Sequence, residues 1–170
     1  MKFSEIPAFT RCRSGSGECV PLHRLKSYIE RSKIEFGLNL EPDFQRGHIW
    51  TEAQQIAFVE FQLRGGRTGK DLYFNDSDYS SNHGSYHEYV CVDGLQRLTA
   101  LLAFVDGKIP AFGLYYSEFE DKPYNVDIYW HTNDLKTKKE VLTWYIEMNS
   151  GGTPHTESEL DRIRAMLEKE

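Results

Sequence analysis

The stretch Glu88–Lys108, EYVCVDGLQRLTALLAFVDGK, joins a short apolar strand to an amphipathic helix through a tight turn. Its first part is rich in β-branched and apolar residues, which is typical of a buried strand. Apolar residues recur at helical spacing after Asp93 and Gly94, and Gly107 follows them as a helix stop. The sequence therefore predicts a strand, a turn and a helix, with an acid, a glycine, an amide and an arginine at the junction.

Further helices are indicated by apolar spacing and by capping boxes, in which a threonine and an acid or amide three residues later satisfy the first backbone N–H groups. The boxes are Thr51 with Gln54, Thr137 with Glu140, and Thr156 with Glu159. Helices are expected at 22–36, at 51–64, and after Thr137 and Thr156.

Two other apolar segments are expected to be extended. DLYFN, residues 71–75, is a short strand candidate, and KIPAFGLYY, residues 108–116, is expected to follow the helix and to give a strand, turn, helix, strand order. The polar segment Asn75–His87 is predicted to be a mobile loop, because it carries few residues that can be buried. These elements predict a mixed domain of the α/β or α+β class, and we expect α+β, a mixed sheet with flanking helices and a C-terminal helical pair.

The chain of 170 residues is long enough for one domain, 1–170, with a flexible segment expected at 1–20. A hydrophobic content of 39% with 14% aromatic residues indicates a folded protein rather than a disordered one. The formal charge of −6 argues against coating nucleic acid by net charge, so any DNA contact is expected to be local. No stretch reaches the roughly 18 apolar residues of a membrane helix, which favours a cytoplasmic protein without membrane contact.

The cysteines and histidines give no metal pattern. Cys91 lies in the apolar strand, where it is typical of a small core residue, and an odd number of cysteines fits a reducing compartment. Cys12 and Cys19 with His23 are a weak zinc signal, because no second pair stands at ligand spacing. We expect no resident metal site and no autonomous metal nuclease.

The junction at Asp93 has the properties of an anion site. The first turn of a helix presents unpaired N–H groups and the positive end of the helix dipole, and Gly94 allows a ligand to approach the backbone. Arg97 adds a planar cationic group that matches phosphate oxygens, and Gln96 is a candidate to orient water or to contact a base or sugar. Asp93 requires a bridging Mg²⁺ or a role as a base toward water.

A structural alternative uses the same residues without a ligand. Asp93 would cap the helix, Arg97 would lie on the solvent face, Arg46 would form a surface ion pair, and Asn149 would cap a helix C-terminus. Each of these roles is common for its residue type, so the sequence leaves both interpretations open at this point.

Three segments, in this order, resemble the N-terminal domain of GmrSD-type modification-dependent restriction systems. They are PDFQRGHIW at 42–50, VDGLQRLTALLAF at 92–104 and YIEMNSGGTPHTESEL at 145–160, and the resemblance runs from about Leu38 to Leu160. It implies a fold similar to that of ParB and sulfiredoxin, and binding, with hydrolysis, of a nucleoside triphosphate. Compact members of this kind are associated with bacteriophage genomes, which would place the protein in the bacterial host cytoplasm.

The family motifs carry over to matching residues of this sequence. The DGQQR motif implies catalytic roles for Asp93, Gln96 and Arg97, with Gly94 at the nucleotide. Further nucleotide-binding residues are implied at Gln45, Arg46, Asn149, Gly151 and Gly152. Leu95 replaces one glutamine of that motif, and the HNH nuclease domain that often follows is not expected after Leu160.

Two other functions compete with nucleotide binding. The same arginines could grip DNA, with Arg11, Arg13, Arg24, Arg64 and Arg67 extending a basic rim, although no aromatic and basic recognition motif is present. The chain could also engage a host or phage protein through Trp50, Trp130 and Trp144, although tryptophan in a small domain is more often part of the core.

Overall fold

The computed structural model describes residues 17–45, 47, 49–79, 85–121, 123, 126–149 and 157–169. The described elements, in chain order, are β1 Gly17–Pro21, α1 Leu22–Phe36, α2 Glu52–Leu63, β2 Asp71–Asp76, β3 Tyr89–Asp93, α3 Leu95–Val105, a 3₁₀ helix Tyr116–Glu118, β4 Asp127–Asn133, α4 Lys138–Asn149 and α5 Glu157–Leu167. The α+β class is therefore confirmed. Among these residues no helix has the length and apolar character needed to cross a membrane.

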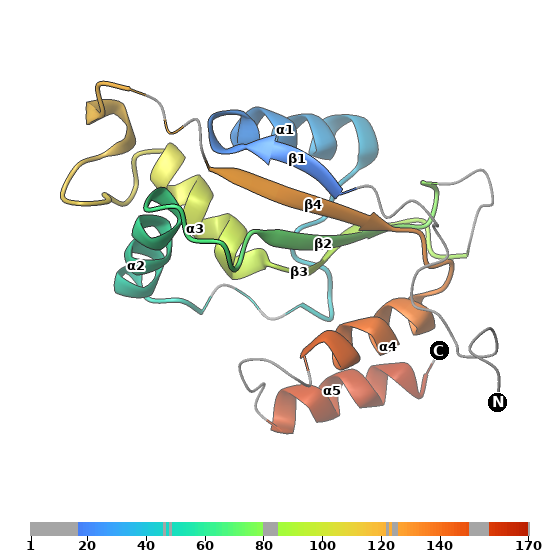
Figure 1. The fold of residues 1–170 in the computed structure, drawn as a ribbon. Coiled ribbons are helices and arrows are strands. Elements are labelled where there is room, and N and C mark those ends of the chain that lie inside the picture. Colours follow the sequence, from blue (N-terminus) through green and yellow to red (C-terminus); the bar gives the residue numbers. More distant parts are fainter. Residues whose placement is uncertain are drawn as a thin grey trace.

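The strands form one mixed sheet in the order β1-β4-β2-β3. The central pair β2 and β4 is parallel, and both outer pairs are antiparallel. Helices α1 and α3 lie on one side of the sheet with α2 against α3, whereas α4 and α5 lie on the other side (Figure 1). Each side therefore buries its own apolar core.

The larger core lies between the sheet and the helices α1, α2 and α3. Phe74 of β2 and Trp130 of β4 stack at its centre, with ring centroids 3.6 Å apart. The indole N–H of Trp130 donates to the hydroxyl of Tyr89, 2.7 Å away, so this buried polar atom has a partner. The smaller core packs Val90 and Val92 of β3 against α4. Because alternate strand residues face opposite sides, β3 contributes to both cores.

The helices predicted at 22–36 and 51–64 are confirmed, the second with its capping box. The box of Thr137 and Glu140 also forms at the start of α4, where each backbone N–H donates to the other side chain. The box expected at Thr156 and Glu159 lies outside the described residues. Of the segment 1–20, residues 17–20 belong to β1 and the remainder is not described.

Two expectations were wrong. The segment 108–116 is not a strand, because Ala111 and Leu114 hydrogen bond to each other across a turn in which Phe112 and Gly113 have φ values of 51° and 77°. The fourth strand is instead DIYWHTN, residues 127–133, which alternates a buried face with a more exposed one. The predicted loop Asn75–His87 also begins too early, because Asn75 is a buried residue of β2.

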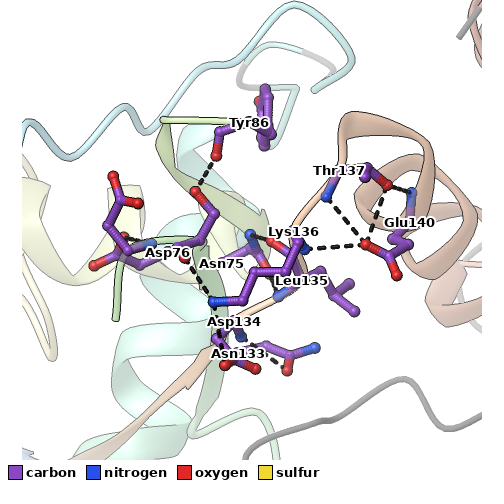
Figure 2. Close-up of polar contacts among 11 residues, drawn as sticks. Asn75, Asp76, Tyr86, Asn133, Asp134, Leu135, Lys136, Thr137 and Glu140 are labelled. Carbon is purple, nitrogen blue, oxygen red and sulfur yellow. Dashed lines mark hydrogen bonds and ion pairs between the residues drawn. The ribbon is translucent and has the colours of Figure 1, made fainter. Parts of the chain in front are cut away.

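The buried side chain of Asn75 forms two hydrogen bonds with the backbone of Leu135, so its polar atoms have partners in the interior. Its amide N–H donates to the Leu135 carbonyl at 3.1 Å, and its amide oxygen accepts from the Leu135 N–H at 2.8 Å. Figure 2 shows the surrounding contacts, in which the Lys136 ammonium donates to the Ser77 carbonyl at 2.7 Å and pairs with Asp134 at 3.4 Å. This cluster fixes the chain between β4 and α4, and thus where α4 begins.

We expect Asn75→Ala to lower the free energy of unfolding by about 3 kcal/mol, since it removes two hydrogen bonds and leaves the Leu135 N–H and carbonyl unpaired in the interior. Urea denaturation followed by circular dichroism measures this loss. Asn39→Ala is the matched control, because Asn39 is exposed and its side chain accepts one local bond from the Glu41 N–H. A loss of less than about 1 kcal/mol is expected for the control, and equal losses would contradict the role given to Asn75.

Candidate functional site

The turn between β3 and α3 requires glycine at position 94. Gly94 is the N-cap of α3 with φ 107° and ψ 3°, a left-handed conformation that other residues rarely adopt. A Cβ at this position would lie 2.4 Å from Leu72 Cδ2, and Leu72 is buried in β2. The backbone therefore passes close to the neighbouring strand, and it presents the first turn of α3 beside the ends of β2 and β3.

Asp93 and Arg97 form an ion pair across this turn. The Arg97 guanidinium donates to the Asp93 carboxylate at 2.5 Å, and the two side chains are 25% and 32% exposed. The structural alternative is wrong for Asp93, because Gly94 is the N-cap and no side chain caps α3, and Arg97 is partly buried rather than on the solvent face. A carboxylate repels an anion, and the pairing reduces that repulsion here because Arg97 offsets the negative charge of Asp93.

Gln96 attaches the preceding loop to the first turn of α3. Its amide oxygen accepts from the N–H groups of Ile49 and Trp50 at 2.9 and 3.1 Å, and its amide nitrogen donates to the Gly47 carbonyl at 3.0 Å. These contacts hold residues 47–50 against the helix start. The catalytic role expected for Gln96 stays a prediction, and it would have to use an amide whose oxygen already accepts two hydrogen bonds.

Gln45 attaches the other end of that loop to β3. Its amide nitrogen lies 3.4 Å from the Cys91 carbonyl and 3.3 Å from the Val92 carbonyl, and its amide oxygen accepts from the Tyr145 hydroxyl at 3.4 Å. Arg46 lies outside the described residues, but Gln45 and Gly47 on either side of it are both tied to the β3-α3 junction. The structure therefore brings the FQR segment and the DGLQR segment together.

The third predicted segment is placed in part. Asn149 is the last residue of α4, and its amide donates to the Tyr145 carbonyl one turn earlier at 2.7 Å. This contact fits the alternative in which Asn149 ends a helix. Tyr145 in turn contacts Gln45, so the end of α4 lies near the FQR segment. Gly151 and Gly152 lie outside the described residues.

Several anchors of the loop were not singled out from the sequence. The Arg162 guanidinium of α5 donates to the carbonyls of Asp43 and Phe44 at 2.9 and 3.1 Å, and the Lys138 ammonium of α4 donates to the Asp43 carboxylate at 2.7 Å. A charged residue on an expected helix gives no sign of such a backbone contact. The C-terminal helical pair thus positions the loop before Arg46.

A polar row across the sheet was also missed. The register aligns Tyr73 of β2 with Asp93 on one side and His131 of β4 on the other. The rings of Tyr73 and His131 stack with centroids 4.9 Å apart, and His131 Nε2 lies 2.7 Å from the Asp71 carboxylate. Burial raises the pKa of Tyr73, with Asp71 and Asp93 adding to the rise and Arg97 opposing it. The signal that could have revealed this row was the alternation in the unpredicted strand DIYWHTN.

The structure also describes some of the candidate metal ligands and the three tryptophans. Among the described residues no three His, Cys, Asp or Glu side chains are grouped as a metal site, and Cys12 is not described. Trp130 and Trp144 are buried, and Trp50 is partly buried with its ring against Phe58. Trp130 and Trp144 therefore belong to the cores rather than to a docking surface.

The fold and the junction define an α+β domain whose central helix starts at a glycine turn next to a paired acid and arginine. The model of one family, described as the GmrSD restriction endonuclease N-terminal domain, matches residues 25–134, so the chain belongs to this family and is a module related to restriction systems. The match includes Gln45, Arg46 and the DGLQR residues and ends before Asn149. No curated protein and no solved structure matches the chain, so the likeness to ParB and sulfiredoxin stays a prediction.

Replacement of Gly94 by alanine should lower the free energy of unfolding by about 3 kcal/mol, the sum of left-handed strain and the contact with buried Leu72. Gly107→Ala separates the two causes, because Gly107 has φ 68° but no atom within 4 Å of the added Cβ. About 1 kcal/mol is expected for it from strain alone. Chemical denaturation of both variants measures the difference, and similar losses would show that Leu72 does not constrain the turn.

Removal of the Gln96 side chain should free the loop without unfolding the domain. In Gln96→Ala the amide hydrogens of Ile49 and Trp50 are expected to exchange with solvent at least tenfold faster, because they lose their acceptor. The Thr51 N–H, which donates to Gln54 at 2.9 Å, is an internal control in the same spectrum. Unchanged exchange at Ile49 and Trp50 would mean that other contacts hold the loop.

Proposed function

We propose that this domain binds a nucleoside triphosphate, with the phosphates at the first turn of α3 between the DGLQR and FQR segments. The proposal rests on the family membership and on the properties of the junction. The observation that carries it is the combination of a left-handed glycine at the start of α3 with a guanidinium in the first turn. Backbone N–H groups, a helix dipole and a fixed arginine are the groups that proteins use for phosphate.

The state of Arg97 supports this assignment. Its one described partner is Asp93, and its buried Nε atom has no hydrogen-bond partner among the described residues. Other N–H groups of the guanidinium are thus available to a phosphate oxygen while the pair with Asp93 holds the plane of the group. A second anion contact would come from Arg46, whose described neighbours Gln45 and Gly47 are both bonded to the junction.

Asp93 would hold Mg²⁺ together with the phosphates, because Mg²⁺ usually takes one or two carboxylates and keeps water and phosphate oxygens as its other ligands. The ion would neutralise phosphate charge. The single partly exposed carboxylate fits that role, and the lack of a three-ligand cluster among the described residues fits a metal that arrives with the nucleotide. Leu95 in the motif and the hydrogen-bonded amide of Gln96 favour binding over fast turnover.

Calorimetric titration with the four ribonucleoside triphosphates, with and without Mg²⁺, tests the proposal. At least tenfold weaker binding is expected for Arg97→Ala, since a charge-assisted bond contributes about 1.5–3 kcal/mol. Arg164→Ala is the matched control, because Arg164 is exposed and pairs with Asp161 within α5, and it should bind as the parent does. A folded Arg97→Ala protein that binds every nucleotide equally well would refute the site.

Duplex DNA in the same assay separates the competing function. Binding of DNA should weaken steeply as salt is raised, whereas nucleotide binding should depend on Mg²⁺ and on phosphate number. Heat from DNA alone, with none from any nucleotide, would assign the arginines to a DNA backbone instead.

A further inference from the structure

A cavity of about 240 Å³ lies at the opposite end of the sheet from the DGLQR turn, between α1 and the strands. The register places it there, because it includes Tyr89, the first residue of β3, whereas Asp93 is the last. Nine of the described residues line it. These residues are Glu18, Tyr28, Arg31, Ser32, Phe36, Asp76, Tyr79, Tyr89 and Thr132.

The wall of this cavity combines aromatic rings with two carboxylates. Tyr28, Tyr89, Phe36 and Tyr79 contribute the rings, and the last two are 58% and 45% exposed. These two rings therefore stay open to solvent at the edge of the cavity, where a ligand can reach them. The ring faces carry negative charge density and attract cations.

The carboxylate residues Glu18 and Asp76 both line the cavity, next to the tyrosines. Glu18 accepts from the Tyr28 hydroxyl at 2.5 Å. Burial, with added effects of Asp76 and Glu18, raises the pKa of Tyr89 to about 12, although its hydrogen bonds with Thr132 and Trp130 oppose the rise. The two acids come from β1 and β2, on either side of β4, and both line the same cavity.

The positive charge in the wall does not balance these acids. Arg31 is the one cationic residue known to line the cavity, and it donates to Glu35 at 2.7 Å, one helical turn further along α1. Burial disfavours the charged form of Asp76 and raises its pKa, with the charge of Asp78 adding to the rise and the Asp78 backbone N–H and Lys136 opposing it. A cation in the cavity would relieve that cost.

From this combination we infer a second ligand site: the cavity binds a small organic cation, an alkylammonium group, with its charge between Glu18 and Asp76 and its carbon atoms against the tyrosine rings. The uncovered rings of Phe36 and Tyr79 mark the entrance. The site is separate from the nucleotide site and does not depend on it. The same chemistry occurs in free amines, in quaternary ammonium compounds and at the end of lysine side chains.

Calorimetric titration of the whole chain with choline, n-butylammonium and 3,3-dimethyl-1-butanol tests the inference. The last compound has the shape of choline without its charge, so it isolates the contribution of the cation. Saturable binding of at least one cation is expected, with the neutral compound at least about tenfold weaker. Failure of both cations to bind, or equal binding of choline and its neutral counterpart, would overturn the site.

Variants locate the binding within the cavity. Asp76→Asn and, independently, Tyr79→Ala are expected to weaken cation binding about tenfold. Tyr79 is exposed, so its replacement keeps the test open if Asp76→Asn fails to fold. Glu30→Gln removes one carboxylate from α1 outside the cavity, and Tyr129→Ala removes an equally exposed ring elsewhere; both should bind as the parent does. Equal losses in variants and controls would overturn the assignment.

Two comparisons complete the test. Arg97→Ala should leave cation binding unchanged, so this site and the nucleotide site can succeed or fail separately. Nα-acetyl-lysine methylamide distinguishes the sources of the cation: tighter binding than n-butylammonium would identify a lysine of a polypeptide, and weaker binding a free amine. Either order supports a cation site.

Discussion

The close approach of Gly94 to Leu72 is the contact on which the rest of the site depends. A side chain at position 94 would push the turn away from β2, and the first turn of α3 would then no longer lie beside the strand ends. Both site contacts start from that turn, because Arg97 reaches back to Asp93 and Gln96 reaches out to the loop. A packing constraint in the core thus determines the position of the polar groups at the surface.

The loop that carries Arg46 is held by side chains from three helices. Gln96 of α3, Tyr145 of α4 and Arg162 of α5 each bond to it, mostly through backbone or amide groups. Such contacts fix the path of the main chain on both sides of Arg46. The helical pair at the C-terminal end therefore belongs to the site architecture, although the family match ends before it.

The sequence predicted most elements and the main junction, for identifiable reasons. Capping boxes and glycine stops are local, so the starts of α2 and α4 and the β3-α3 turn could be recognised without knowledge of the fold. β1 and β4 were missed because GECVP and DIYWHTN have weak patterns of their own and become strands by pairing with each other. Segment 108–116 is apolar enough for a strand, but positive φ values at Phe112 and Gly113 fold it into a turn.

The motifs of the candidate site could be predicted from the sequence, but most of their hydrogen-bond partners could not. DGLQR and FQR could be associated by motif, whereas the partners of Gln45 and Gln96 are carbonyls and N–H groups, which carry no sequence signal. The row of His131, Tyr73 and Asp93 depends on strand register, which cannot be read from a single chain when one of the strands is not recognised.

The position of β4 between β1 and β2 has a consequence for synthesis on the ribosome. β1 has no described strand partner other than β4, so its hydrogen-bonding edge stays unpaired until Asn133 has left the exit tunnel. During that interval the nascent chain already contains β2 and β3, and the edge of β2 that pairs with β4 is still open. The last strand to be made is the one that joins the sheet into a single unit, so folding of this domain is completed late in translation.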